Sequence, residues 1–182
     1  MSDIILETQR LIIRKWRDSD LQPMAAINQD PQVMEYFPAP KNLEETRSFI
    51  IANMRIYEQV GYCFYAVELK DNHKFIGFVG LSPVGDELPC GPAVEIGWRL
   101  GVKYWGKGYA NEAAQAIVAH AFNILGINEL VTFTASTNKK SEKLMQRLGF
   151  ERSEQDDFDH PKIADGHILQ RHVFYKKLKS QL

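Results

Sequence analysis

Three glycines, Gly101, Gly106 and Gly108, lie close together between a strand-like run that ends at Leu100 and a helical run that begins at Tyr109. A turn of this composition directs several backbone N–H groups toward one spot in front of a helix amino terminus, where the helix dipole also favours an anion. The pattern therefore predicts the binding of a phosphate or pyrophosphate. A plain strand-to-helix loop, in which the glycines serve only the turn geometry, is the alternative that the pattern leaves open.

Two nucleotide-binding motifs come close to this segment and fail. Gly101, Gly106 and Lys107 are in register with the P-loop of nucleoside triphosphatases, but Gly108 stands where that motif has a magnesium-binding Ser or Thr. The dinucleotide-binding pattern GxGxxG also fails, because Asn111 takes the place of its third glycine. The sequence therefore argues against an ATPase, a GTPase and a GxGxxG dinucleotide site.

The residues around this turn need a scaffold, and the chain shows interleaved strand and helix patterns. Strands are predicted over residues 11–16, 62–69, 75–84, 94–100, 130–135 and 167–177, with a further one beginning at Phe150. Helices are predicted from Asp18 onward with Pro23 and Met24 in its early turns, from Asn42 to Gly61, from Tyr109 to Gly126, and from Asn138 through Leu148. The short turn at 71–73 makes residues 62–84 an antiparallel hairpin. This order predicts an α/β fold with a mixed, mostly antiparallel central sheet and flanking helices.

Local signals define the ends of the helices and the faces of the elements. Asn42 and Glu45 have the spacing of a capping box, and Gly61 is a helix stop. The third helix carries an apolar stripe, which consists of Ala110, Ala113, Ala114, Ile117, Ala121, Ile124 and Leu125. In the strand at 94–100 the period of two puts Glu95, Gly97 and Arg99 on one face.

Composition limits the classes of function. The 182 residues are 45% hydrophobic, enough for one domain with a core, and the net charge of -1 provides no basic field for nucleic acid or an anionic membrane. No run approaches the roughly 18 apolar residues of a membrane span, and residues 1–17 lack the apolar region of a signal peptide. We therefore expect a cytoplasmic protein. Cys63 and Cys90 belong to no disulfide or zinc pattern and are expected to be reduced.

The glycine segment resembles motif A of the GNAT superfamily of N-acetyltransferases, R/Q-x-x-G-x-G/A, whose backbone amides hold the pyrophosphate of acetyl-CoA. Lys103, Gly106 and Gly108 take its fixed positions, with Lys in place of the usual first residue. Residues 138–150 resemble motif B of the same superfamily, in the N-x-x-S form followed by Leu-Gly-Phe that is typical of the branch related to the ribosomal-protein acetyltransferases RimJ and RimL. Residues 8–14 resemble the first strand of that branch.

The resemblance implies one N-acetyltransferase domain over residues 1–182 that moves an acetyl group directly from acetyl-CoA to a primary amine, with no metal. It implies that the cofactor is bound by Trp98, Leu100, Lys103, Tyr104, Trp105, Gly106, Lys107, Gly108, Tyr109, Ala110, Asn138 and Ser141. The acceptor stays open between a peptide or protein amino terminus and a small amine such as a polyamine or an antibiotic, and so does a homodimer. A CoA-binding sensor without turnover and an interaction module are the rival functions.

Catalytic roles follow from the resemblance and from the needs of acyl transfer. Glu95 is the candidate general base, directly or through water, with a surface pair of Glu95 and Arg99 as the alternative. Ser141 is the candidate acid for the CoA thiolate, because Met145 stands where many members carry a Tyr. Asn138 either contacts the cofactor arm or the amine, or is only a helix cap.

The carboxy-terminal third adds an acidic stretch and three histidines. The acidic residues are Glu151, Glu154, Asp156, Asp157 and Asp159, and the histidines are His160, His167 and His172. A solvated acidic loop is the simplest interpretation. The functional alternative is an acidic mouth for a cationic acceptor, with His160 as an alternative base. The spacing of the histidines matches no familiar metal site, so no metal is predicted.

The acceptor's own pKa sets how strong a base is needed. An α-amino group with a pKa of about 8 loses its proton at pH 7 at a cost of about 1.4 kcal/mol, whereas a lysine amine near 10.4 costs about 4.6 kcal/mol. A weak, water-relayed base therefore suffices for an amino terminus. This slightly favours peptide or protein amino termini over small amines.

Overall fold

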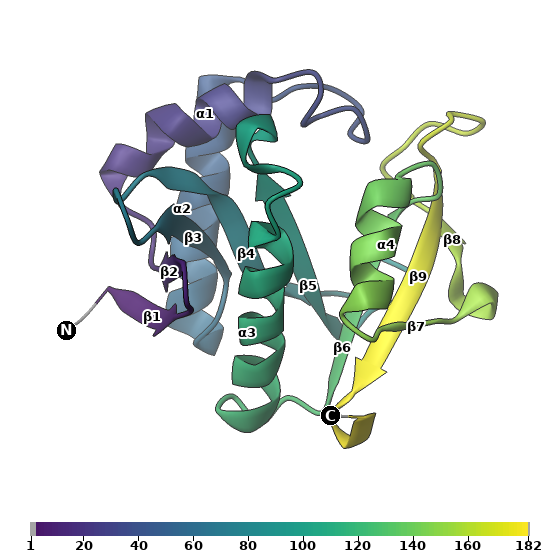
Figure 1. The fold of residues 1–182 in the computed structure, drawn as a ribbon. Helices are drawn as coiled ribbons and strands as arrows, with labels where there is room; N and C mark the ends of the chain where they lie inside the picture. Colours follow the sequence, from purple (N-terminus) through teal and green to yellow (C-terminus); the bar gives the residue numbers. More distant parts are fainter. Residues whose placement is uncertain (1–2, 182) are drawn as a thin grey trace.

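The computed structural model describes residues 3–181, and all the strands of this part of the chain belong to one sheet (Figure 1). Its strands are β1 (Ile4–Glu7), β2 (Leu11–Arg14), β3 (Phe64–Leu69), β4 (Phe75–Val84), β5 (Ala93–Leu100), β6 (Glu129–Ala135), β7 (Glu151–Arg152), β8 (Phe158–Asp159) and β9 (Arg171–Leu178). They follow the order β1-β2-β3-β4-β5-β6-β9-β7, and β8 also pairs with β9. Residues 1, 2 and 182 of the predicted domain lie outside the described residues.

The junction between β5 and β6 differs from the rest of the sheet. Within residues 3–181 it is the only parallel pair, because α3 (Tyr109–Asn123) crosses from one strand to the other. Glu95 and Val131 are in register here, and the two strands diverge from one another (Figure 1). Antiparallel pairing elsewhere confirms the predicted mixed, mostly antiparallel sheet with flanking helices in one α/β domain.

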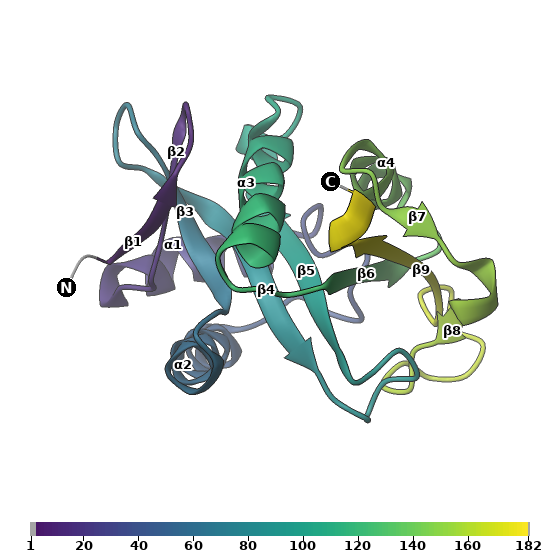
Figure 2. The ribbon, with the colours of Figure 1, turned by 90° about the horizontal axis from the view of Figure 1, so that it is seen from below.

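Helices cover both faces of the sheet (Figure 2). On one face, α3 and α4 (Lys139–Arg147) belong to the core that contains Ile96 and Leu100 of β5. On the other face, α1 (Leu21–Gln29) and α2 (Leu43–Val60) pack with Ala66 and Phe78. Side chains that alternate along β5 therefore point to two different layers.

The ends of two helices follow from local chemistry, as predicted. Asn42 caps α2 by accepting from the backbone N–H of Glu45, whose carboxylate accepts in return from Asn42, and Gly61 ends the helix in the left-handed conformation at φ 82°. Asn138 caps α4, and Gly149 follows that helix at φ 76°. These caps fix where the chain enters and leaves the two helices.

Three predictions about the elements were wrong in detail, and one strand was not predicted. Asp18 does not cap a helix: it begins a 3-10 turn, Asp18–Asp20, and α1 starts only at Leu21. The last strand starts at Arg171 rather than at His167, because residues 160–170 form successive turns. Ile124 does not join the buried stripe of α3. Ile124 is 73% exposed, because α3 ends at Asn123, one residue earlier. β1 has no counterpart in the predicted strands.

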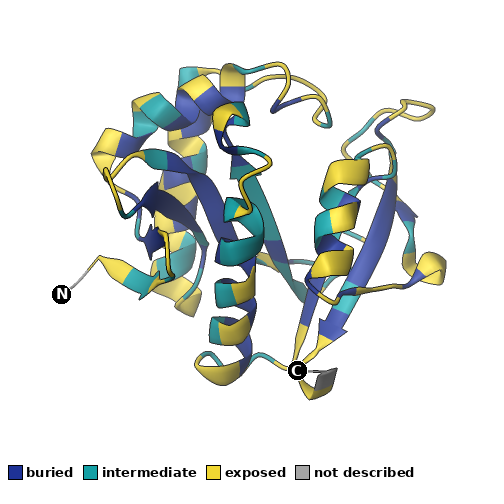
Figure 3. Cartoon of the chain, viewed as in Figure 1, coloured by how far each residue is buried: buried dark blue, intermediate teal, exposed yellow. Residues whose placement is uncertain are grey.

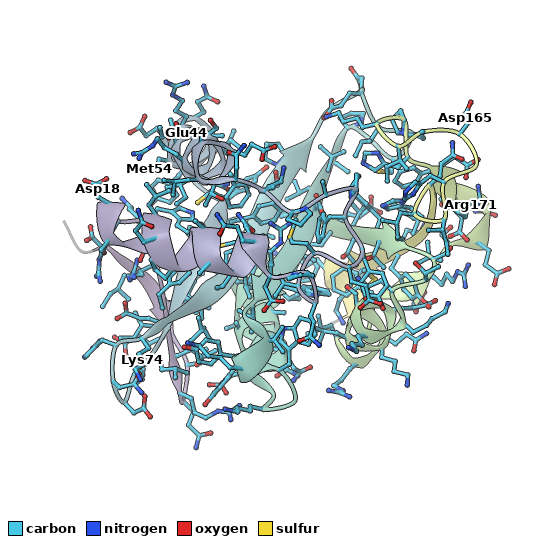
Figure 4. The ribbon with its side chains drawn as sticks, turned by 90° about the horizontal axis from the view of Figure 1, so that it is seen from above. Asp18, Glu44, Met54, Lys74, Asp165 and Arg171 are labelled. Carbon is cyan, nitrogen blue, oxygen red and sulfur yellow. The ribbon has the colours of Figure 1, made fainter. Side chains whose placement is uncertain are left out.

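Buried residues concentrate along the central strands and on the inward sides of the helices, as Figure 3 shows. None of the helices in residues 3–181 is both long and apolar enough to cross a membrane. Figure 4 places Asp165 and Arg171, which belong to the histidine-bearing segment 160–172, on the opposite side of the molecule from Asp18.

Candidate active site

The turn between β5 and α3 exposes backbone amides at the start of a helix. Gly106 and Gly108 are exposed and adopt left-handed backbone conformations, at φ 71° and 80°. Residues other than glycine rarely adopt these conformations. Gly108 is the residue before α3, and no side chain caps the first turn of that helix. Lys103 and Lys107 are exposed on the same turn. The arrangement can therefore bind an anion through free N–H groups, the helix dipole and two ammonium groups.

Arg10, from the turn between β1 and β2, supports this turn from below. Its Nη1 donates to the carbonyl oxygen of Lys107 at 2.9 Å, and its Nε donates to Glu112 of α3 at 2.6 Å. Thr8 donates to the same carboxylate at 2.6 Å, and the guanidinium lies 4.6 Å from the ring centroid of Tyr109. Burial works against ionisation of Glu112, but the hydrogen bonds from Thr8 and Arg10 outweigh it and lower the pKa of this carboxyl.

Aromatic side chains connect the turn to the strands that diverge beside it. Trp105 donates its indole N–H to the carbonyl oxygen of Leu100 at 2.8 Å, and Tyr104 is buried in the core. The ammonium of Lys140, in the first turn of α4, lies 4.9 Å from the centroid of the Trp105 ring. Trp98 is partly buried against the core on the α3 side. The two segments predicted from motif A and motif B therefore meet across the open end of β5 and β6.

Asn138 is a helix cap with both of its amide groups engaged. Its Oδ1 accepts from the backbone N–H of Ser141 at 3.2 Å, and its Nδ2 donates to Thr134 of β6 at 3.0 Å. Ser141 is partly exposed, and its hydroxyl forms no hydrogen bond within residues 3–181. Met145 is only 1% exposed and belongs to the core, so it offers no group to a reaction. Ser141 thus carries the available hydroxyl at the start of α4.

Glu95 lies in β5 beside Val131, where the parallel pair is in register. A Cβ on Gly97 would lie 3.5 Å from a carboxylate oxygen of Glu95 and 3.0 Å from the ring of Phe64, so both residues face the α1–α2 side. Burial raises the pKa of Glu95 to about 8. Within residues 3–181 no ion pair joins Glu95 to Arg99.

His160 and His172 lie next to one another near the start of β9, with their rings tilted relative to each other. Their ring centroids are 4.9 Å apart, and Phe158 lies against both rings. His172 pairs across the sheet with Ala135, the last residue of β6, and so faces the same side as Phe133. Burial and nearby Lys162 lower the pKa of His160, and burial lowers the pKa of His172. This face of β6 continues the one that carries Glu95 on β5.

Three of the five acidic residues in this stretch form ion pairs or hydrogen bonds with nearby side chains. Asp157 bonds Arg152 at 2.6 Å, Asp159 lies 3.4 Å from Arg171, and Asp156 accepts from Ser153 at 2.5 Å. These pairs favour the solvated loop over an acidic mouth. Among residues 3–181 no group of three His, Cys, Asp or Glu side chains has an arrangement that could hold a metal ion.

The structure brings most of the predicted site together at the open end of the β5–β6 junction. The turn at 103–110, Asn138 and Ser141 meet there, and Glu95 lies further down β5. His160 joins the same face of the sheet through its contact with His172. The sequence did not reveal the support that Arg10 gives to the turn. The signal was absent because this contact joins residues 102 positions apart.

Two open hollows lie in the surface. One, of about 420 Å³, is lined by Arg14, Glu68 and their neighbours, and the other, of about 500 Å³, lies between α1 and the glycine turn, where Lys103 and Tyr104 line it. Neither is lined by Glu95, Ser141 or His160. The second hollow therefore borders the predicted cofactor site, and the first lies apart from it.

Comparison with known proteins places this arrangement among acetyltransferases. The family model for the acetyltransferase (GNAT) domain matches residues 10–151. The chain is 25% identical over 150 residues to the "Uncharacterized N-acetyltransferase YoaA" of Bacillus subtilis (strain 168), an alignment that covers 81% of this chain and 83% of YoaA.

Solved structures give the same result. A GNAT-family acetyltransferase from Bacillus anthracis superimposes with a TM-score of 0.79 and 27% identity, covering 96% of this chain and 98% of that one. RimL, described as a ribosomal alpha-N-protein acetyltransferase in complex with coenzyme A, superimposes with a TM-score of 0.79 and 18% identity over 98% of this chain and 99% of its own. The second likeness concerns the fold alone.

Proposed function

This chain belongs to the GNAT acetyltransferase family and is an N-acetyltransferase, and we propose that it moves the acetyl group of acetyl-CoA directly to the primary amine of an acceptor. The observation that carries the proposal is the uncapped start of α3, preceded by Gly106 and Gly108 in left-handed conformations. Glu95 lies in β5, the strand that leads into this turn, and Ser141 lies in the first turn of α4. The proposal assigns each of these groups one task.

Acetyl-CoA fits the residues present in the turn. A Cβ at Gly106 would meet nothing within 4 Å and one at Gly108 would meet only Arg10, so the space in front of α3 is open. The amides from Gly106 to Ala110 would hold the pyrophosphate, with Lys103 and Lys107 adding positive charge. Trp98, Leu100, Tyr104, Trp105, Tyr109 and Asn138 would line the path of the cofactor. When bound, acetyl-CoA supplies the activated acyl group as a thioester.

Glu95 takes a proton from the acceptor amine, directly or through one water. With its pKa raised to about 8, Glu95 is mostly protonated at pH 7, and its ionised fraction, which grows toward pH 8, is a stronger base than a solvated carboxylate. His160 is the alternative base, because its ring is on the same face of the sheet and burial keeps it neutral. Its Nδ1 accepts a hydrogen bond from the backbone N–H of Lys162 at 3.2 Å, which leaves Nε2 for other partners.

Ser141 gives a proton to the departing thiolate. Its hydroxyl is partly exposed at the start of α4 and forms no hydrogen bond within the described part of the chain. Asn138 accepts a hydrogen bond from the backbone N–H of Ser141, and this bond fixes the backbone position from which the Ser141 side chain extends. We assign Asn138 a positioning role in addition to its cap.

The test is an acetylation screen across acceptor classes. Free thiol release from acetyl-CoA is followed with a peptide that has a free amino terminus, the same peptide with that terminus blocked, a polyamine and a simple alkylamine, and the products are weighed by mass spectrometry. Release that requires a free amine, with a gain of one acetyl group, supports the proposal. Calorimetric binding of CoA without release for every acceptor would instead favour a CoA-binding module, and no binding of CoA would overturn the cofactor assignment.

Four further assignments are part of the proposal. Residues 1–182 are one N-acetyltransferase domain, supported by the match over residues 10–151 and by the continuous sheet. A cytoplasmic location and a homodimer stay predictions. Peptide or protein amino termini remain the first acceptor class to test, because they need the weaker base.

A further inference from the structure

Arg99 is half-buried, and no carboxylate in residues 3–181 balances its charge. No Asp or Glu in that range forms an ion pair with it, and its Nε is buried without a hydrogen-bond partner. Its one hydrogen bond within these residues goes from Nη1 to the neutral amide oxygen of Asn28, at 2.7 Å. Removing part of a guanidinium from water without a counter-ion is costly, so such groups are normally paired.

The chain contains its own example of a buried structural arginine. Arg14 is 2% exposed, and it binds Asp20 at 2.7 Å and Glu68 at 2.7 Å. Those two carboxylates account for its charge within the core. Arg99 has no such arrangement, so support of the fold alone does not explain why an arginine stands at this position.

Its surroundings hold the guanidinium in place without neutralising it. Arg99 lies between the rings of Phe37 and Phe78, at 4.2 Å and 5.4 Å from their centroids. Asn28, which accepts from it, is itself fixed by a hydrogen bond of 3.0 Å to Thr46 of α2. Burial lowers the pKa of Arg99 to about 10, which leaves it charged at neutral pH. A rigid, poorly solvated guanidinium is well suited to bind a planar carboxylate.

The position of Arg99 relates this charge to the reaction. Arg99, Gly97 and Glu95 alternate along β5, so all three belong to one face, and four residues of strand span roughly 13 Å between the Cα atoms of the outer two. Gly97 has no side chain of its own, and the ring of Phe64 lies over it, 3.0 Å from where a Cβ would be. The face therefore carries a base and an unpaired cation in one line, with an apolar ring beside the backbone between them.

We propose that Arg99 binds a carboxylate of the acceptor, and that the acceptors of this enzyme are amines that carry a carboxylate several bonds from the reacting nitrogen. The proposal rests on the acetyltransferase function given above and names its substrate class. Peptides with an acidic residue near the amino terminus and ω-amino acids both have this chemistry. Polyamines have only cationic groups, which Arg99 would repel.

The experiment compares acceptors that differ only in this group. The kcat and KM for acetylation are measured for 6-aminohexanoate against 6-aminohexanamide, and for a peptide beginning Ser-Glu against one beginning Ser-Gln, with spermidine as a third acceptor. The enzymes are the wild type, Arg99→Gln, Arg99→Lys and Arg55→Gln, in which an exposed arginine of α2 is changed as the control.

We expect the wild type to prefer the carboxylate in at least one pair by roughly ten- to a hundredfold, mostly in KM, as for hydrogen bonds to a charged group. Arg99→Gln should remove this preference, Arg99→Lys should keep part of it, and Arg55→Gln should keep all of it. If Arg99→Gln does not fold, the comparison of wild type with Arg99→Lys decides. The pair that shows the preference tells whether the carboxylate comes from a peptide or a small molecule.

Equal use of carboxylate and amide by the wild type, a preference that survives Arg99→Gln, or spermidine as the best acceptor would each overturn the proposal. A loss of CoA affinity in Arg99→Gln with unchanged preference would assign Arg99 to the cofactor instead. Calorimetry of each acceptor in the presence of CoA gives a readout that does not need turnover. Arg99-dependent binding without acetylation would therefore count against the proposed function while it supports the carboxylate site.

Discussion

Glu95 combines burial with the absence of a charged partner in residues 3–181, and this makes its proton exchangeable near neutral pH. A carboxylate in an ion pair has a lowered pKa and is a poor base, as happens to Glu112 beside Arg10. Desolvation without a partner has the opposite effect and raises the pKa of Glu95 to about 8. A glutamate thus supports the glycine turn at position 112, whereas at position 95 a glutamate is suited to proton transfer.

The pH dependence of the reaction separates Glu95 from His160. With an alkylamine acceptor of pKa about 10, kcat/KM of the wild type should bend near pH 8, where Glu95 ionises. In Glu95→Gln we expect that bend to vanish and kcat/KM at pH 7 to fall roughly a hundredfold, with a smaller defect as the pH approaches the pKa of the amine. His160→Ala is the matched comparison. A pH-dependent defect confined to the histidine variant would give His160 the role, and a defect in neither would mean that the amine arrives neutral.

Ser141→Ala tests the proton donor at the start of α4. The hydroxyl forms no hydrogen bond within residues 3–181, so its loss should leave folding almost unchanged. We expect kcat to fall roughly ten- to a thousandfold while the CoA dissociation constant stays within twofold, because the group acts on the leaving thiolate. Ser136→Ala, just beyond β6, is the control. Turnover at the wild-type rate in Ser141→Ala would show that water supplies the proton.

The helices show which features of elements can be predicted from the sequence. The starts of α2 and α4 were predicted correctly, because the caps at Asn42 and Asn138 are made by residues only three positions apart. The start of α1 was not, because the 3-10 turn at Asp18–Asp20 is held by Arg14, which donates two hydrogen bonds to Asp20. This contact joins the end of a strand to the turn six residues later, outside the three-residue spacing of a helix cap, so it leaves no capping signal in the sequence.

The same limit applies to the candidate site. The glycine turn was found because its conformations are encoded in Gly106 and Gly108 themselves. The closeness of His160 to His172 depends on the pairing of β8 with β9 and on the path of residues 160–170. Neither the turns of that segment nor the isolated charge of Arg99 could be deduced from spacing.

Gly108→Val tests the turn as an anion-binding element. At φ 80° a β-branched residue is strained, and its side chain would project toward the space in front of α3. We expect CoA affinity to fall at least tenfold in a variant that still folds, as measured by calorimetry. Gly126→Val, at φ 70° beyond the far end of α3, carries a similar strain away from the turn and should retain CoA binding. Unchanged CoA affinity in folded Gly108→Val would remove the turn from the binding site.

Arg10 is a positioning residue in this element. By holding the carbonyl oxygen of Lys107, it turns the opposite side of that trans peptide, the N–H of Gly108, away from itself. Arg10→Gln should weaken CoA binding about three- to tenfold and change the melting temperature little, because its ion pair with Glu112 is largely exposed. Lys70→Gln breaks the neighbouring exposed pair with Glu7 and should leave CoA binding intact. Equal CoA affinities in the two variants would contradict this role.

At the scale of the whole molecule, one irregular junction in a continuous sheet creates the site. The mixture of helices and a close hairpin predicted this kind of sheet correctly, because strand pairing through a short turn is local. The divergence of β5 from β6 was not predicted from the residues themselves, since it depends on how α3 and α4 pack on one face of the sheet. At this junction Glu95 is desolvated by burial, so ionising its carboxyl lowers the stability of the whole fold.

The stability of the protein should therefore depend on pH through Glu95. Between about pH 4.5 and 8 the folded protein keeps a proton on this carboxyl that the unfolded chain releases, so wild-type stability falls as the pH rises through this window. Glu95→Gln has no charge to bury, and its free energy of unfolding should exceed that of the wild type by about 1–3 kcal/mol at pH 8, with little difference at pH 4.5. Denaturant unfolding at a series of pH values measures this difference, and Glu58→Gln on the exposed side of α2 is the control. A pH-independent offset in Glu95→Gln, or the same curve in both variants, would mean that Glu95 ionises in the folded protein as easily as in water.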